Sequence, residues 1–360
     1  MSKIRVLVVD DSAFMRKVIS DIINADEELE LVGTARNGQD ALDKIPILQP
    51  DVITLDVEMP QMNGLEALQK IMQIRPTPVV MLSSLTQLGA DITIKSLAYG
   101  AIDFVQKPGG AISLNINDAA KEIIQKIKMA KRANLKQDTF VVKEKIEQSG
   151  VAISPPNSTK WSDTSLDFPL VVIGTSTGGP KALHNVIENL PENLNAAILI
   201  VQHMPPGFTK SLAQRLNSLT QLIVKEGENG EKLQSGYIYV APGNYQMEVQ
   251  LNDFGELVLC LHQGPLVTGH RPSVDALFKS VANTQFKKVV AVIMTGMGYD
   301  GRAGIKELKG IGAYTIAEAE ETCVVFGMPK AAIEAGAINR IVPLQDIAKE
   351  IVKGVNFINI

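Results

Sequence analysis

Acidic residues end two of the apolar runs in the first part of the sequence. Asp10 and Asp11 follow the run IRVLVV, and Asp56 ends the run DVITLD. Because the carboxyl ends of parallel strands lie at the same edge of a sheet, we expect these three carboxylates to converge. Crowded carboxylates raise one another's pKa unless a cation neutralises them, and oxygen ligands with room for water suit Mg²⁺. The pattern predicts a magnesium site at this edge.

Two more side chains are expected at the same edge. Ser83 ends the run TPVVMLS, and Lys107 follows the run AIDFVQ. A carboxylate nucleophile beside Mg²⁺, a lysine and a hydroxyl is suited to phosphoryl transfer onto an aspartate, since the metal and the lysine stabilise charge on the transferring oxygens. A lone acid at a strand end is often an ordinary solvated loop residue, but the five residues together indicate a phosphorylation site.

A second candidate site begins at the segment Gly174-Thr175-Ser176-Thr177-Gly178, which fits the pattern G-x-S-x-G between a strand and a helix. The glycines allow a sharp turn with exposed backbone N–H groups, and the helix N-terminus favours developing negative charge. Ser176 is therefore a candidate nucleophile. The same turn could equally be a phosphate-binding loop, so a partner residue must decide.

The search for a base is short because the sequence has only four histidines. His203 ends the run AAILIVQ and so falls at the same sheet edge as Ser176, and Asp300 follows the run VVAVIMTG. His184 lies too far along the helix after Ser176 to reach back easily. Three strand ends thus predict a Ser-His-Asp relay, in which the acid orients the base and the base activates the hydroxyl.

A different order of triad residues is conceivable. It would use Asp253 with His262 or His270, but these histidines fall in a region of short strands, so we disfavour it. An oxyanion needs backbone N–H donors, and the glycine-rich loop TGMGYDG offers them, especially at Met297.

The elements that carry these residues form two α/β alternations. From residue 4 to 107, five apolar runs alternate with amphipathic stretches, which predicts a doubly wound parallel sheet, and a lysine-rich helical pattern follows. Residues 136–167 are polar and contain SPPNSTKWSDTS, which is typical of a linker. The second alternation includes GYIYVA and ELVLCLH, expected as antiparallel hairpins. We therefore divide the chain into domains at 1–135 and 168–360, joined by the linker.

Composition supports two ordinary globular domains. The chain has 360 residues, 45% of them hydrophobic, and a formal charge of −4, which argues against binding nucleic acid by bulk charge. Cys260 and Cys323 are too few for a disulfide framework or a cysteine-rich metal site and are expected as buried thiols. We find no secretory signal and no run of 18 apolar residues, so we expect a cytoplasmic protein without membrane insertion.

The first half resembles a response-regulator receiver domain over nearly its full length. The likeness is carried by VVDDS, LDVEMPQMNG, MLSS and FVQKP. It implies a flavodoxin-like fold that is phosphorylated with the help of Mg²⁺. The roles it implies are phosphoryl acceptor for Asp56, magnesium ligands for Asp10, Asp11, Asp56 and the backbone carbonyl of Glu58, phosphoryl contacts for Ser83 and Lys107, and aromatic switch for Phe104.

The second half, from Phe168 to Val355, resembles the catalytic domain of chemotaxis protein-glutamate methylesterases, the CheB family. The likeness is carried by VIGTSTGGP, VQHMPPGFT, YVAPGN, GHRPSVD, MTGMGYDG and ETCVVFGMP. One departure is visible, because the family usually has a histidine where this sequence has Gln246. The roles implied are nucleophile for Ser176, general base and acid for His203, orienting carboxylate for Asp300, an oxyanion N–H for Met297 and a place near the nucleophile for Thr177.

Together the halves resemble a phosphorylation-activated methylesterase. The resemblance implies hydrolysis of γ-glutamyl methyl esters on chemoreceptors to glutamate and methanol through an acyl-enzyme, without a cofactor at the esterase site. Some members also deamidate receptor glutamines, which the same intermediate permits. The implied partners are methylated chemoreceptors and a chemotaxis histidine kinase, with no nucleic acid, and we expect a monomer. We also expect the unphosphorylated receiver to pack against the catalytic mouth.

Three other functions are alternatives to the predicted esterase. A catalytically inactive, phospho-regulated adaptor would keep the same sequence blocks. A DNA-binding response regulator would need a basic recognition surface, and the second half shows no helix-turn-helix pattern. A general serine peptidase would use the same relay but would cleave casein.

Overall fold

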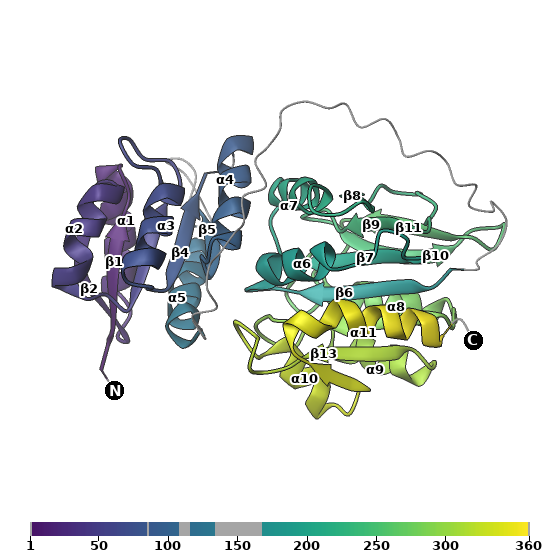
Figure 1. The fold of residues 1–360 in the computed structure, drawn as a ribbon. Coiled ribbons are helices and arrows are strands. Elements are labelled where there is room, and N and C mark those ends of the chain that lie inside the picture. The colour runs from purple at the N-terminus through teal and green to yellow at the C-terminus, as the bar shows by residue number, and fades with distance from the viewer. Residues whose placement is uncertain (1, 85, 108–115, 134–167, 359–360) are drawn as a thin grey trace.

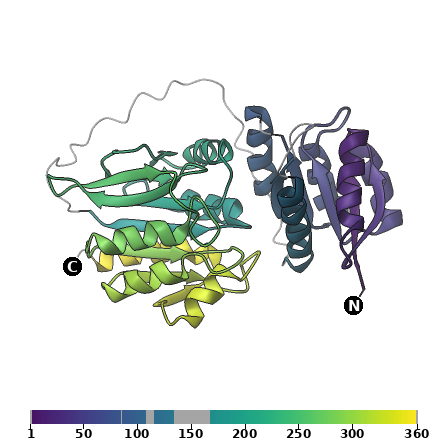
Figure 2. The ribbon, with the colours of Figure 1, turned by 180° about the vertical axis from the view of Figure 1, so that it is seen from behind.

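The computed structural model describes residues 2–84, 86–107, 116–133 and 168–358. These residues form two α/β units, drawn in purple to blue and in teal to yellow in Figure 1. Figure 2 shows the same two units from behind. The segment 136–167, predicted as a linker, lies outside the described residues.

The first unit is a parallel five-stranded sheet in the order β2-β1-β3-β4-β5. Its central strands β1, β3 and β4 are short, apolar and mostly buried, as expected where helices cover both faces, whereas most of the edge strand β2 is only half-buried. The strand order reverses between β1 and β3, which opens the carboxyl edge at that point. The strands are β1 Ile4–Val9, β2 Leu29–Ala35, β3 Val52–Asp56, β4 Val79–Ser83 and β5 Asp103–Gln106.

Helices cover both faces of this sheet. One face packs against α1 and α5, and the other packs against α2, α3 and α4. Four of these helices begin with a side chain that accepts a backbone N–H three residues on, at Ser12, Asn37, Asn63 and Thr86. The helices are α1 Ala13–Asn24, α2 Gly38–Leu48, α3 Gly64–Ile74, α4 Gln87–Ala98 and α5 Ile116–Arg132.

The second unit is a parallel seven-stranded sheet in the order β14-β13-β12-β6-β7-β9-β8. Its core strands β6, β7 and β12 are wholly buried. The predicted doubly wound α/β fold is therefore confirmed in both halves. The strands are β6 Leu170–Thr175, β7 Ala197–Gln202, β8 Ile223–Glu226, β9 Tyr237–Val240, β12 Val289–Ile293, β13 Tyr314–Glu318 and β14 Arg340–Val342.

Six helices and a hairpin flank this larger sheet. Helices α6, α7 and α11 pack on one face, while α8, α9, α10 and the hairpin pack on the other. The hairpin pairs β10 Gln246–Leu251 with β11 Leu257–His262 in antiparallel register. The helices are α6 Gly179–Glu188, α7 Phe208–Asn217, α8 Val274–Asn283, α9 Arg302–Gly310, α10 Met328–Glu334 and α11 Leu344–Phe357.

The run GYIYVA differs from its prediction. It forms β9, which pairs in parallel with both β7 and β8, so only the run ELVLCLH joins an antiparallel hairpin. The connection from β8 to β9 contains no helix and instead crosses β11, where the N–H of Leu233 donates to the carbonyl of Leu257 at 3.0 Å. Because the hairpin accepts backbone hydrogen bonds from this connection, the chain can cross over without a helix and β8 and β9 can run in the same direction.

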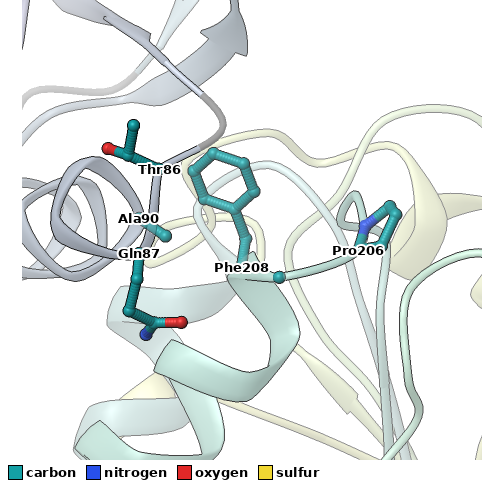
Figure 3. Close-up of a pocket in the computed structure, with 6 residues that line it drawn as sticks. Thr86, Gln87, Ala90, Pro206 and Phe208 are labelled. Carbon is teal, nitrogen blue, oxygen red and sulfur yellow. The ribbon is translucent and has the colours of Figure 1, made fainter.

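The two units meet through helices. Helix α4 of the first unit packs against α6 and α7 of the second, and a single hydrophobic cluster runs through both units. The rings of Phe104 and Phe208 lie 4.5 Å apart between centroids, and Gln87 Nε2 donates to Ser211 Oγ at 3.1 Å. A pocket at this junction lies between the start of α4 and the segment 206–208 (Figure 3).

No helix within the described ranges is long and apolar enough to cross a membrane.

Candidate functional site

The carboxyl edge of the first sheet gathers three acids and one lysine. One carboxylate oxygen from each of Asp10, Asp11 and Asp56 lies within 4.8 Å of the other two, with Asp11 exposed and the other two residues buried. Lys107 Nζ lies 2.8 Å from Asp10 Oδ2 and 2.7 Å from Asp56 Oδ2. Residues from three strand ends, far apart in sequence, therefore form one cluster.

The charges of this cluster are unbalanced. Burial raises the pKa of Asp56 to about 6, and the neighbouring Asp10 adds to that rise while Lys107 opposes it. Burial opposes the charge of Lys107, but hydrogen bonds to Asp10 and Asp56 outweigh that effect and raise the lysine pKa. Three crowded carboxyl groups against one ammonium form a donor set of oxygens that fits Mg²⁺.

Two residues of the same edge face helix α4. Ser83 Oγ accepts a hydrogen bond from Thr93 Oγ1 at 2.8 Å, so the hydroxyl points toward that helix. The N–H of Glu58 donates to Asp56 Oδ1 at 3.2 Å, while its carboxylate accepts from Ser84 Oγ at 2.9 Å and from Thr86 Oγ1 at 3.5 Å. Because Thr86 caps α4, Glu58 connects the acidic cluster to the start of that helix.

The second site lies at the carboxyl ends of β6, β7 and β12. Ser176 follows β6 at a turn in which Gly178 has a φ of +80°, a conformation that favours glycine, and α6 begins at Gly179. The N–H of Ser176 donates to the carbonyl of Thr295 at 3.0 Å. His203 follows β7, and its N–H donates to the carbonyl of Thr175 at 3.2 Å. The backbone of His203 is thus held by the residue directly before Ser176.

His203 and Asp300 form a direct pair. Nε2 of His203 lies 2.7 Å from Asp300 Oδ2, and the two side chains are 7% and 1% exposed. Asp300 also accepts four hydrogen bonds at the start of α8 and of α9. The donors are the Ser273 hydroxyl at 2.8 Å and the N–H groups of Val274 at 2.7 Å, Asp275 at 3.1 Å and Gly301 at 3.1 Å.

These contacts set the protonation of the pair. Burial would raise the pKa of Asp300, but the hydrogen bonds of His203 and of the α8 N-terminus outweigh it and hold that pKa far below the usual range. An ionised carboxylate can only accept, so Nε2 of His203 carries the proton and Nδ1 is left as the acceptor. Nδ1 is buried and has no hydrogen-bond partner among the described residues. Its lone pair is free to take a proton.

A second loop lies directly against the serine. A Cβ on Gly296 would come within 2.8 Å of Ser176 Cβ and 2.3 Å of Met328 Sδ, so only glycine allows this approach. Thr295 Oγ1 donates to the carbonyl of Thr177 at 2.9 Å, which ties the loop to the serine turn. Met297, the sequence candidate for the oxyanion N–H, follows in this loop.

The first unit reaches both of these segments. Thr177 Oγ1 donates to Asp103 Oδ2 at 2.5 Å, and Asp103 Oδ1 lies 3.1 Å from Lys126 Nζ. Gln125 Nε2 of α5 lies 3.1 Å from the sulfur of Met297. Sequence reasoning missed these contacts, because nothing in the local pattern distinguishes Asp103 from an ordinary acid at the start of a strand.

The other three histidines bear on the alternative relay, which would use Asp253 with His262 or His270. Asp253 is exposed in the turn between β10 and β11, and His262 lies 3.3 Å from Glu248 on that hairpin. His184 lies within α6. Sequence reasoning also set His270 aside, yet its ring stacks on His203 with centroids 3.7 Å apart and planes 9° apart. The available signal was its position three residues before Ser273, the cap of α8.

Known proteins are similar to this chain along both halves. The family model for the response regulator receiver domain matches residues 6–116, and that for CheB methylesterase matches residues 171–351. A protein-glutamate methylesterase/protein-glutamine glutaminase of Geobacillus kaustophilus is 51% identical over 356 residues, which cover 98% of this chain and 99% of the relative. The chain belongs to the CheB methylesterase family.

Two further CheB relatives extend the match. The protein of the same description from Pyrococcus horikoshii is 48% identical over 357 residues, covering 99% of this chain and 95% of its own. The crystal structure of the Thermotoga maritima CheB methylesterase catalytic domain matches with a TM-score of 0.50 and 45% identity, covering 52% of this chain and 98% of that one. The predicted membership in the CheB family, with a receiver domain before the catalytic domain, is confirmed.

Proposed function

We propose that this CheB-family protein hydrolyses γ-glutamyl methyl esters on chemoreceptors to glutamate and methanol, under the control of phosphorylation at Asp56. The observation that carries the proposal is the His203–Asp300 pair, whose free Nδ1 belongs to a histidine anchored beside Ser176. Relatives that match along nearly their whole length are named for this activity.

We assign the esterase steps to Ser176, His203 and Asp300. Ser176 Oγ attacks the ester carbonyl while Nδ1 of His203 takes its proton, and the resulting imidazolium is stabilised by the ionised Asp300. Negative charge develops on the carbonyl oxygen near the loop of Met297 and the serine turn, where backbone N–H groups can stabilise it. When the intermediate collapses, the histidine returns its proton to the leaving methoxide and methanol departs.

The acyl-enzyme is then hydrolysed by the same groups. Water attacks the Ser176 ester, His203 accepts its proton, and the proton passes to the serine oxygen as glutamate leaves. A glutamine side chain could form the same acyl-enzyme with ammonia as the leaving group, so we extend the proposal to glutamine deamidation. The relatives' names include this second activity.

The acidic cluster at the carboxyl edge of the first sheet would control the esterase activity. We assign Asp56 as the phosphoryl acceptor from a chemotaxis histidine kinase and Lys107 as the group that contacts the phosphoryl oxygens. Asp10, Asp11, Asp56 and the backbone of Glu58 would hold Mg²⁺, which neutralises charge on the transferring oxygens when bound. The crowding of carboxyl groups around one lysine supports that assignment.

Contacts between the two units support inhibition in the unphosphorylated protein. Asp103 binds the hydroxyl of Thr177, and Gln125 contacts Met297, so the receiver covers the segments on both sides of the nucleophile. Phe208 extends this contact to the start of α4, as Figure 3 shows. Phosphorylation can activate only if the phosphorylated receiver favours a state in which these contacts are broken.

The proposal is tested by methanol release from a methylated chemoreceptor, with and without Mg²⁺ and a small phosphodonor. We expect the donor to accelerate release, Ser176→Ala to abolish it, and Asp56→Asn to leave the basal rate without acceleration. Absence of release from folded protein that still becomes phosphorylated would instead favour an inactive adaptor. Cleavage of casein would favour a general peptidase.

A further inference from the structure

A second histidine lies face to face with the base of the relay. The rings of His270 and His203 are stacked with centroids 3.7 Å apart and an interplanar angle of 9°. In stacked rings the N–H bonds lie within each ring plane, so neither ring directs a hydrogen bond at the other. His270 is therefore placed to contact the flat face of the imidazole rather than to exchange a proton with it.

A tight turn holds His270 in this place. The N–H of His270 donates to the carbonyl of Val267 at 2.9 Å, and the N–H of Val267 donates back at 3.1 Å. Between them, Thr268 has a φ of 52° and Gly269 a φ of 85°, as a two-residue hairpin turn with both central residues left-handed requires. A β-branched threonine is disfavoured at such an angle, so surrounding contacts must hold the turn.

Gln246 supplies those contacts. It is 1% exposed, and its Nε2 donates to the carbonyls of Pro265 at 3.2 Å and His270 at 2.9 Å. Its Oε1 accepts the N–H of Ser273 at 2.9 Å. A single buried amide thus joins the turn before His270 to the cap of α8.

The same short segment positions both members of the His203–Asp300 pair. His270 covers the ring of His203, and Ser273, three residues later, donates to Asp300. A shift of the segment would therefore disturb the imidazole plane and the carboxylate together. Positioning of this kind is needed because reactive groups must be held within a fraction of an ångström and about 10–20° of the productive geometry.

We infer that His270 is a positioning residue that fixes the plane of the His203 imidazole, so that Nε2 meets Asp300 while Nδ1 stays free for the serine, and that Gln246 sets the place of His270. This inference rests on the proposed esterase function. A neutral aromatic face suits the role, because it attracts the cation that forms on His203 during turnover. Burial, assisted by the nearby His203, lowers the pKa of His270 to about 4, so the ring is neutral at neutral pH.

The test compares His270→Phe with His270→Ala in the full-length protein, activated by Mg²⁺ and a phosphodonor. Phenylalanine keeps a flat ring without any proton to exchange, whereas alanine removes the ring. We expect alanine to lower kcat for methanol release roughly 10-fold or more with KM nearly unchanged, and phenylalanine to restore kcat to within about 3-fold of the parent. His262→Phe, on the outer hairpin, is the matched control and should leave both constants unchanged.

Labelling of Ser176 by a fluorophosphonate probe gives a second readout that needs no receptor. The labelling rate should follow the same order among the variants, with Ser176→Ala as the blank. If the parent releases no methanol yet labels in this order, the proposed function fails while the positioning role stands. Phenylalanine as slow as alanine in both assays would overturn the role in favour of proton transfer by His270, and an alanine variant as fast as the parent would overturn it altogether.

Gln246 is tested in the same assays. Gln246→Leu removes the hydrogen bonds of Gln246 to the carbonyls of Pro265 and His270 and to the N–H of Ser273, and we expect a loss of labelling rate in the same direction as His270→Ala. Gln246→Glu keeps the acceptor for Ser273 but loses the donor to His270, so it should lose rate as well. If Gln246→Leu lowers only the melting temperature and folded protein labels at the parent rate, Gln246 has no part in positioning.

Discussion

At the scale of single residues, Asp300 carries the tightest set of constraints. It is buried, it receives donors from two helix starts, and it binds the one nitrogen of His203 that must keep its proton. The opposite nitrogen is left free as a consequence. The chemistry of the proposed relay therefore depends on the charge of a residue that substrate is not expected to touch.

Replacing Asp300 by asparagine tests that dependence. The amide oxygen can still accept from the α8 N-terminus, but the amide nitrogen is a donor, so His203 loses the acceptor that fixes its tautomer. We expect Asp300→Asn to lower kcat by about 10³-fold or more with little change in KM, by analogy with other serine relays. Steady-state methanol release checks this, and a loss of less than tenfold would contradict the assignment of Asp300.

His270 also makes a prediction about acid stability. Its pKa is lowered to about 4 in the folded protein by burial, so between pH 6.5 and 4 the unfolded chain binds a proton that the folded one does not. Stability from this group is present above pH 6.5 and lost as the pH falls. His270→Phe should therefore lose about 2 kcal/mol less unfolding free energy between pH 7 and pH 5 than the parent. Urea unfolding at both pH values measures the difference, and equal losses would be inconsistent with a half-buried, neutral imidazole.

At the scale of elements, the site is built from strand ends and from loops that approach one another closely. Gly178 turns the chain from β6 into α6, and Gly296 lets the loop after β12 lie against Ser176. Parallel strands bring these ends to one edge, but the fine positions depend on contacts between the loops, such as Thr295 with Thr177. Close packing of these loops is thus part of the proposed catalytic geometry.

A methyl group at Gly296 should disturb that packing. Its Cβ would meet Ser176 Cβ at 2.8 Å and Met328 Sδ at 2.3 Å, so the loop must move away from the nucleophile. We expect Gly296→Ala to lower kcat about 100-fold, as a displacement near 1 Å can do. Gly310→Ala, at the end of α9 with open space around it, is the control and should keep full activity. Equal activity of the two variants would show that the loop accommodates a methyl group without displacement, against this prediction.

At the scale of the whole molecule, the receiver covers the catalytic edge through a few polar contacts and an apolar core. Helix α4 packs on α6 and α7, and Glu58 connects the acidic cluster to the cap of α4 at Thr86. A change at Asp56 can therefore reach the junction through Glu58 and the start of α4. The predicted packing of the receiver against the catalytic mouth has a physical basis in Asp103 and Gln125.

Loosening the junction should raise the basal rate. Asp103→Ala removes the acceptor of Thr177, and the loss of one such hydrogen bond is worth about 1 kcal/mol, or a factor of roughly 5 in the closed-to-open ratio. We expect a basal methanol release several-fold higher and a smaller further gain from the phosphodonor. Asp21→Ala, on the exposed face of α1, is the control. A basal rate equal to that of the control would argue against inhibition by this contact.

The sequence by itself determined the two α/β alternations and which strand ends carry reactive side chains, because apolar periodicity is local and parallel strands share a carboxyl edge. It could not determine that β9 runs parallel to β8, because that direction depends on a connection whose backbone hydrogen-bonds to β11. Nor could it show which nitrogen of His203 meets Asp300, 97 residues away, or that Asp103 meets Thr177, 74 residues away. His270 was set aside because it falls in a region of short strands, and the turn that brings it to His203 is held by Gln246, a contact across 24 residues. Such contacts depend on the paths of loops through space, and only the tertiary structure decides them.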